Sequence, residues 1–422
     1  MASAPQPLRP QSAAGDSDIR LLFVTRIARL FAYGLLSVVL ALYLAALGLT
    51  TPQIGALLTL TLIGDTVISL WLTVVADRVG RRRMLLVGAG LMLFAGVLFA
   101  FSHRFVVLLV AATLGVISPS GNEIGPFLSI EQAALSEAVP FARRTRVFAW
   151  YNLVGSFATA VGALAGGCIA QLLQGAGHPA LESYRVLVEA YAGFGVLLAV
   201  LFARLSLRVE PATASLKALD SGVRVRLGLH RSRGIVARLA ALFALDAFGG
   251  GFVIQSLVAY WFHMRFGTEP ALLGAIFFGA NLLAGASALL AARVAARIGL
   301  INTMVYTHLP SNVLLMLVPL MPNQYLAIAM LLLRFSISQM DVPTRQSYVM
   351  AVVSPDERSA AAGVTGVARS VGASASPGLA GLFLGTAGLA SVPFFLSGAL
   401  KIVYDLLLYR SFRATRPSEE KR

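Results

Sequence analysis

The segment "LTVVADRVGRRRMLLVG" (72–88) places five charged residues between two apolar stretches. The whole chain of 422 residues is 57% hydrophobic and only 13% charged, whereas a soluble domain usually carries about 25% charged residues. So few charges could not cover the surface of a soluble protein of this length. The composition therefore predicts an all-α integral membrane protein, because helices satisfy their own backbone hydrogen bonds in lipid.

Twelve apolar segments are each long enough to cross a bilayer, which takes about 20 residues. They cover residues 19–47, 53–76, 83–101, 105–138, 146–174, 185–206, 235–264, 270–295, 300–319, 323–351, 358–386 and 389–410. A basic segment separates six spans from six. The predicted organisation is a disordered tail at 1–18, a six-helix bundle at 19–206, a linker at 207–234, a second six-helix bundle at 235–410 and a tail at 411–422.

The net charge of +15 is concentrated in alternate loops between the spans. Loops rich in Lys and Arg stay on the cytoplasmic side of a membrane. We therefore expect the linker, both tails and both termini to be cytoplasmic, in a protein of the plasma (inner) membrane. Because the basic residues lie in short loops, they indicate membrane topology rather than a nucleic-acid partner. The expected surroundings are a lipid bilayer, and the expected state is a monomer.

The two halves of the chain resemble each other. "IGALLTLTLIGDTVISLWLTVVADRVG" (54–80) aligns with "LGAIFFGANLLAGASALLAARVAARIG" (273–299). "EQAALSEAVPFARR" (131–144) aligns with "RQSYVMAVVSPDER" (345–358), and "GALAGG" (162–167) aligns with "SPGLAG" (376–381). These matches predict two pseudo-symmetric six-helix bundles, a layout used by alternating-access transporters.

The opening segment contains a motif with a known counterpart. "ADRVGRR" (76–82) is similar to the pattern G-x-x-x-D-R-x-G-R-R/K between helices 2 and 3 of the major facilitator superfamily, with Thr73 in place of the first glycine. Together with twelve spans and a basic linker, it identifies the chain as a member of that superfamily. The segment 341–358 resembles uncharacterised bacterial members, so the expected source is bacterial and no subfamily is assigned. The resemblance implies a transporter and not an enzyme.

The same resemblance implies a conformational role for this loop. It implies that Asp77 faces the start of span 11, at 359–361, and that the neighbouring arginines pair with carboxylates at helix ends, Glu131 and Glu137 being candidates. Such pairs would lock the halves together in the outward-facing state. The alternative is a basic loop that only fixes topology. The predicted latch comprises Asp77, Arg78, Gly80, Arg81, Arg82 and Glu131.

Several ionisable residues fall in the middle of predicted spans. Each costs about 2.5–3.5 kcal/mol in lipid, so it should face a cavity or a partner. Spans 1, 4, 7 and 10 line the cavity in the superfamily, and Gly and Pro residues surround Glu123 in "SPSGNEIGPF" (118–127) and follow Asp246 in "FGGGF" (248–252). The predicted substrate-binding or proton-coupling residues are Arg29, Tyr33, Asp65, Glu123, Asp246, Asn281, Arg334 and Arg369.

A purely structural alternative exists for some of these charges. Arg29 with Asp65, and Arg369 with Asp246, could be ion pairs that only join helices. His308 is expected to be a packing residue, because span 9 is peripheral in the superfamily. The sequence contains no metal-ligand cluster, nucleophile–base pair or phosphate-binding glycine loop, so we expect no enzyme activity, no metal and no cofactor.

The leading functional hypothesis is a secondary active transporter that works by alternating access. A proton on Asp65, Glu123 or Asp246 would drive it, because burial makes a carboxylate easier to protonate. "GALAGG" (162–167) is similar to the motif G-P-x-x-G-G of the superfamily's antiporters, with Ala163 in place of the proline. This resemblance implies efflux of a small organic compound in exchange for protons. An alternative is uptake or exchange of an anion, since the mid-membrane cations outnumber the acids. An alternative of another class is a lipid flippase or a membrane receptor on the same scaffold.

Overall fold

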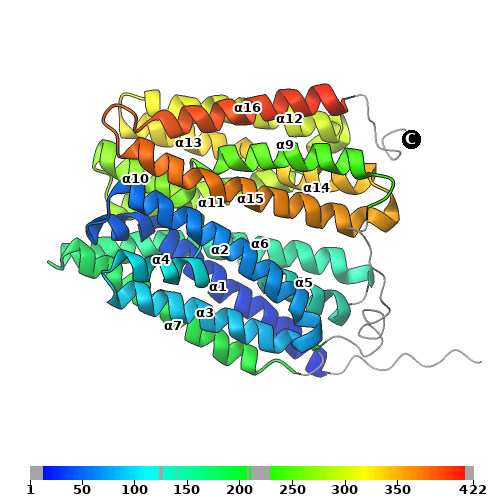
Figure 1. Cartoon of the computed structure of the whole chain (residues 1–422), viewed down its shortest axis with the longest axis horizontal. Helices are drawn as coiled ribbons and strands as arrows, with labels where there is room; N and C mark the ends of the chain where they lie inside the picture. Colours follow the sequence, from blue (N-terminus) through cyan, green and yellow to red (C-terminus); the bar gives the residue numbers. More distant parts are fainter. Residues whose placement is uncertain (1–12, 123–126, 140, 207–208, 211–228, 414–422) are drawn as a thin grey trace, which may run out of the picture.

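The computed structural model describes residues 13–122, 127–139, 141–206, 209–210 and 229–413, and all regular structure in these residues is helical. The helices form two groups that lie side by side (Figure 1). The first group comprises α1 (Ala13–Ala46), α2 (Thr51–Val79), α3 (Arg81–Phe101), α4 (Phe105–Leu114), α5 (Phe127–Ala138), α6 (Phe141–Gly175) and α7 (Ala180–Ala203).

The second group follows the linker. It comprises α9 (Arg233–Gly251), α10 (Gln255–Phe266), α11 (Pro270–Ile298), α12 (Leu300–Leu317), α13 (Gln324–Ser338), α14 (Asp341–Val352), α15 (Arg358–Leu384) and α16 (Val392–Phe412). Two short 3-10 turns, η2 (Val318–Leu320) and η3 (Pro355–Glu357), join its helices. The predicted all-α fold with two helical bundles is confirmed.

The apolar helices account for the twelve predicted spans. Ten segments of the described chain are long and apolar enough to cross a membrane. Two further spans complete the set: the pair α4 and α5, which is interrupted, and α15, whose many Gly and Ser residues lower its hydropathy. The arrangement is that of a multi-pass membrane protein.

Three spans that we expected to be continuous are broken. The spans 105–138, 235–264 and 323–351 each divide into two helices; the described residues between these helices are 115–122, 252–254 and 339–340. Proline and glycine explain the breaks. The first contains Pro119 and Gly121, whose φ of +68° favours glycine, the second follows a run of three glycines, and Pro343 in the first turn of α14 removes a helical N–H donor. These are spans 4, 7 and 10, whereas span 1 is the unbroken α1.

The two groups meet at one end of the molecule. We call the end where α1 begins and α16 ends the terminal end, and the opposite one the distal end. Near the distal end α2 packs on α15 and α6 on α11. A Cβ added at Gly381 would lie 2.8 Å from the Cα of Gly55, and one added at Gly167 would lie 2.8 Å from the Cα of Gly274. The repeat alignment matches these two contacts to each other, as pseudo-symmetric halves require.

Candidate functional site

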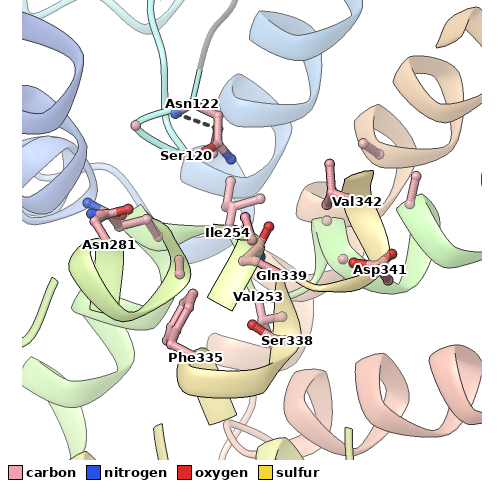
Figure 2. Close-up of a pocket in the computed structure, with 18 of the residues that line it drawn as sticks. Ser120, Asn122, Val253, Ile254, Asn281, Phe335, Ser338, Gln339, Asp341 and Val342 are labelled. Atoms are coloured by element: carbon pink, nitrogen blue, oxygen red, sulfur yellow. Dashed lines mark hydrogen bonds between the residues drawn. The ribbon is translucent and has the colours of Figure 1, made fainter. Parts of the chain in front are cut away.

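A cavity of about 590 Å³ lies between the two groups of helices, within the size range of small-molecule sites. The breaks in spans 4, 7 and 10 supply much of its wall. Figure 2 shows Ser120 and Asn122 from the first break, Val253 and Ile254 from the second, and Gln339 from the third around one space. The broken helices therefore expose backbone and polar side chains where lipid does not reach, which is the setting that tolerates them.

The breaks in spans 4 and 7 contact each other across the interface. The carbonyl of Pro119 accepts a hydrogen bond from the N–H of Ser256 at 3.1 Å, and the hydroxyl of Ser256 lies 2.8 Å from the carbonyl of Ser37. Gln255 donates to the hydroxyl of Ser37 at 2.8 Å. Backbone groups freed by one break are thus satisfied by the other, and these contacts close the cavity on its distal side.

Asp246 of α9 is the centre of a charged cluster on the cavity wall. Its carboxylate accepts hydrogen bonds from Lys401 Nζ of α16 at 2.6 Å, Arg345 Nη1 of α14 at 3.2 Å and Arg369 Nη1 of α15 at 3.2 Å. Arg345 also pairs with Asp341 at 3.0 Å. The side chain of Arg369 is 36% exposed, whereas the other four are at least nine-tenths buried. One carboxylate therefore joins four helices.

His308 extends this cluster, which corrects the prediction that it is a peripheral packing residue. Its Nδ1 lies 2.8 Å from Asp405 Oδ1, its Nε2 lies 3.8 Å from Asp246 Oδ1, and its ring is part of the cavity lining. Asn312 donates to the second oxygen of Asp405 at 3.1 Å. Because α12 packs against both α14 and α16, a residue of span 9 reaches the charges of spans 7 and 12.

Arg334 of α13 lines the same cavity. Within the described chain no Asp or Glu oxygen lies within 4.0 Å of its guanidinium nitrogens, and its Nε has no hydrogen-bond partner. Its guanidinium lies 5.0 Å from the ring centre of Phe335. Among the described lining residues, cations outnumber carboxylates: Arg26, Arg334, Arg345, Arg369 and Lys401 stand against Asp246 and Asp341.

The first half holds its main ion pair away from the cavity. Arg29 of α1 donates to both oxygens of Glu131 of α5, at 2.9 and 2.7 Å, and both side chains are fully buried. Thr25 and Tyr151 also donate to this carboxylate. The expected pairing of Arg29 with Asp65 is therefore wrong, because α5 and not α2 presents the carboxylate to this face of α1. Asp65 accepts a hydrogen bond from Ser69 at 3.1 Å.

The eight predicted site residues thus fall into three groups. Asp246, Asn281, Arg334 and Arg369 line the cavity. Three others lie outside its lining: Arg29, Tyr33, which is buried and stacks on Tyr191, and Asp65. The eighth, Glu123, lies outside the described residues.

Two charged residues of α14 on the cavity wall were missed by the prediction from sequence. Asp341 and Arg345 are four residues apart on α14 and form an ion pair. The sequence did contain a signal for this pair, because opposite charges at positions i and i+4 share one face of a helix. We had treated this segment as the end of a continuous span, which places both residues too far from the centre.

At the terminal end, Arg81 forms one of the ion pairs expected of the latch. Its Nη2 lies 2.9 Å from Glu137 Oε1. Glu131 does not take part, which corrects its assignment to the latch. It lies six residues before Glu137, or about 9 Å along the helix, and faces Arg29 in the bundle interior. Arg78 is exposed, and the side chain of Asp77 lies outside the described residues.

Glu210 is an unexpected partner of the same loop. Its carboxylate accepts hydrogen bonds from the N–H groups of Arg81 at 2.6 Å and Arg82 at 3.2 Å, at the first residues of α3. The guanidinium of Arg82 donates to the carbonyl of Ala203. Gly80, with φ of +117°, makes the turn before α3. A carboxylate at a helix N-terminus is favourable because the free N–H groups and the helix dipole are both positive there.

Glu357 plays a similar part in the second half. Its buried carboxylate accepts hydrogen bonds from the N–H groups of Arg231 at 2.6 Å and Ser232 at 2.8 Å, and from that of His230, just before α9. Burial opposes its ionisation, but the Ser232 hydroxyl and these three N–H groups outweigh it and lower the pKa of Glu357 to about 2. The start of α9 is therefore tied to η3 by an ionised side chain.

Comparisons with known proteins identify the family of the chain. A family model described as Major Facilitator Superfamily matches residues 22–377. An uncharacterized membrane protein of Saccharomyces cerevisiae, YJR124C, is 31% identical over 417 residues, which cover 93% of each chain.

Solved structures share the fold at lower identity. A bacterial homologue of the human lysosomal transporter Spinster, in an inward-facing and unoccupied conformation, has a TM-score of 0.74 at 14% identity and covers 96% of this chain and 99% of its own. A D-xylose–proton symporter has a TM-score of 0.72 at 15% identity, with 93% and 97% covered. At these identities the likeness concerns the fold.

Proposed function

The chain belongs to the major facilitator superfamily and is a multi-pass membrane transporter, and from this premise we propose that it carries a small organic anion by alternating access. The resemblance of the motif at 76–82 to that superfamily is confirmed by the match over 22–377. The substrate class follows from the cavity rather than from any relative.

The observation that carries the proposal is the guanidinium of Arg334. It lines the cavity, and no described carboxylate lies within 4.0 Å of it. A cation in a membrane-embedded site is costly unless an opposite charge or water compensates it. A carboxylate or phosphate of a substrate would supply that charge, and the planar fork of arginine suits such groups. The partly exposed Arg369 offers a second contact for the same substrate.

The geometry favours this anion hypothesis over a proton carried by Asp246. Lys401, Arg345 and Arg369 all contact the Asp246 carboxylate, and nearby cations favour the ionised form of a carboxyl group. Proton coupling through Asp65 or Glu123 stays a prediction.

The expectation of efflux rested on the glycines of "GALAGG". In the structure Gly162 and Gly166 contact the backbone of α1, and Gly167 contacts α11. A Cβ at Gly162 would lie 2.1 Å from the carbonyl oxygen of Phe31. Close helix packing accounts for these glycines, whichever way the substrate moves. Rocking of the two halves about the cavity, with the distal contacts separating as the terminal ends approach each other, would give access from either side in turn.

The proposal is tested by counterflow in proteoliposomes. Vesicles that contain the protein are loaded in turn with carboxylates, phosphate monoesters, neutral sugars and organic cations, and uptake of the labelled compound is measured. We expect exchange of at least one anion and of none of the cations. Exchange of neutral or cationic compounds alone would contradict the proposal.

A variant set assigns the effect to Arg334. Arg334→Gln should lower anion exchange roughly ten- to a hundredfold, the equivalent of a charged hydrogen bond worth about 1.5–3 kcal/mol, and Arg334→Lys should retain part of it. Arg238→Gln is the control, because Arg238 is an exposed arginine of α9. If Arg334→Gln exchanges the anion as fast as the parent protein, Arg334 does not bind the substrate and the proposal loses its support.

A further inference from the structure

We propose that His308 and Asp405 form a proton site coupled to the cavity, in which His308 takes up one proton when an anion draws Arg369 away from Asp246. This inference rests on the proposed anion transport. It assigns the coupling to spans 9 and 12, whereas the sequence directed attention to carboxylates of spans 2, 4 and 7.

The hydrogen bonds around His308 define which nitrogen is free to take the proton. Asn312 donates to one oxygen of Asp405 at 3.1 Å, and the other oxygen lies 2.8 Å from Nδ1 of His308. Nδ2 of Asn312 also lies 3.3 Å from Nδ1 of His308. We assign the hydrogen of the neutral ring to Nδ1, because its shorter contact is to a carboxylate oxygen, which only accepts hydrogen bonds. The lone pair of Nε2 then points toward Asp246, whose Oδ1 is 3.8 Å away. A proton added at Nε2 would create a new donor aimed at that carboxylate.

Charges of both signs surround the His308 ring. Asp405 and Asp246 favour a positive ring, whereas the cations oppose it. The groups that face this region are Asp246 from α9, Arg334 from α13, Asp341 and Arg345 from α14, Arg369 from α15, and Lys401, Tyr404 and Asp405 from α16. With the cavity empty, four cations act against protonation. An anion that binds Arg334 and Arg369 neutralises two of them.

Binding of the anion also changes the surroundings of Asp246. Arg369 is the most exposed of the three cations that contact Asp246, so it is the one that a substrate in the cavity can reach. Once Arg369 turns to the substrate, the Asp246 carboxylate has lost one of its three contacting cations. A protonated His308 then supplies the missing positive charge through Nε2. A monovalent anion and one proton together add no net charge to the membrane interior, which lowers the cost of burying the anion.

The protonation state of His308 can be measured without any substrate. The protein is labelled with ¹⁵N at its five histidines and studied by NMR in lipid nanodiscs, and His308→Gln identifies the signal. At one fixed mildly acidic pH, Arg369→Gln should increase the imidazolium fraction, since it removes a cation as an anion would, and Asp246→Asn should decrease it. His263→Gln is the matched control at the distal end. An unchanged His308 signal in both variants overturns the inference, whether or not anions are carried.

Transport then tests the coupling. For the anion found by counterflow, a gradient of one pH unit should support about tenfold accumulation if one proton accompanies each anion. His308→Gln should lose this accumulation even if some anion exchange, which moves no net proton, is still measurable, whereas His263→Gln should keep both. Asp405→Asn serves the same purpose if His308→Gln does not fold. If His308→Gln and Asp405→Asn both still accumulate the anion tenfold, the inference is overturned while the proposal of anion transport stands. If the parent protein exchanges no anion at all, the proposed function itself is overturned.

Discussion

Each half of the molecule joins its first and fourth spans by an ion pair, and the signs are exchanged between the halves. In the first half Arg29 of α1 contacts Glu131 of α5, and in the second half Asp246 of α9 contacts Arg345 of α14. The repeat alignment places Glu131 opposite Arg345. The two pairs therefore occupy corresponding places in the scaffold.

Their surroundings differ. The first pair is bidentate, fully buried and outside the cavity lining. The second lies on the cavity wall and shares its carboxylate with Lys401 and with the partly exposed Arg369. Pseudo-symmetry therefore determines where charges can be placed, whereas access to the cavity determines what they can do. We interpret the Arg29–Glu131 pair as a structural contact that stabilises the first bundle, and the Asp246–Arg345 pair as part of a binding site.

The largest expected effect is in the first half. Glu131→Gln removes the bidentate carboxylate partner of the fully buried Arg29, which should lower the free energy of unfolding by about 3–5 kcal/mol and reduce the yield of folded protein. Thermal unfolding in detergent and the yield after size-exclusion chromatography measure this effect.

A double variant shows whether the lost charge balance is the cause. Arg29→Met combined with Glu131→Met removes both charges, and such replacements are often neutral or stabilising. We expect the double variant to regain most of the stability lost in Glu131→Gln. If Glu131→Gln is as stable as the parent, the contrast between the two halves fails.

The corresponding change in the second half should affect stability less and transport more. Asp246→Asn leaves Arg345 paired with Asp341 and leaves Arg369 in contact with the cavity, so the expected loss of stability is about 1–3 kcal/mol. Anion exchange should fall at least tenfold. Unfolding and counterflow measured on the same preparation separate the two effects. A loss of stability as large as that of Glu131→Gln would mean that both pairs serve the fold alone.

The fold was largely predictable because the bilayer permits few alternatives. Length, hydropathy and the internal repeat predicted twelve spans in two bundles. The aligned glycines Gly55 and Gly274 lie where the halves touch in the structure, but the alignment alone did not predict these contacts. The breaks in spans 4, 7 and 10 were less clear, although Pro119 and Pro343 gave their positions, because a proline alone does not distinguish a kinked helix from a divided one.

The partners of the charged residues were not predictable in the same way. Hydropathy places a residue along a helix, but its rotation about the helix axis decides which neighbour it faces. Arg29 could therefore be located at mid-span from the sequence, while its pairing with Glu131 rather than Asp65 could not. The cap of Arg81 by Glu210 spans 129 residues of sequence, and no local pattern connects the two.

A smaller effect is expected at the turn before α3 in the first half. Gly80 has φ of +117°, and an added Cβ would lie 3.1 Å from the Glu210 carboxylate. Gly80→Ala should therefore destabilise by about 1–3 kcal/mol through backbone strain. The control is Gly90→Ala, since Gly90 lies inside α3 with no neighbouring atom within 4 Å of an added Cβ. Alanine should stabilise that helix slightly. Equal melting temperatures for the two variants would contradict the role assigned to the Gly80 turn.

The last expected effect concerns the corresponding cap in the second half, and it depends on pH. The pKa of Glu357 is lowered from 4.5 to about 2 by the hydroxyl and N–H donors before α9, despite its burial. A group whose pKa is lower in the folded state stabilises the fold above its unfolded pKa, and this stabilisation is lost as the pH falls through the folded value. The parent protein should therefore melt at a higher temperature than Glu357→Gln at neutral pH, and the difference should shrink between about pH 4.5 and pH 2. Glu269→Gln, at an exposed position before α11, is the matched control and should show no comparable change. A difference between parent and Glu357→Gln that is the same at neutral pH and at about pH 3 would show that the shape of the side chain, and not its charge, holds the start of α9.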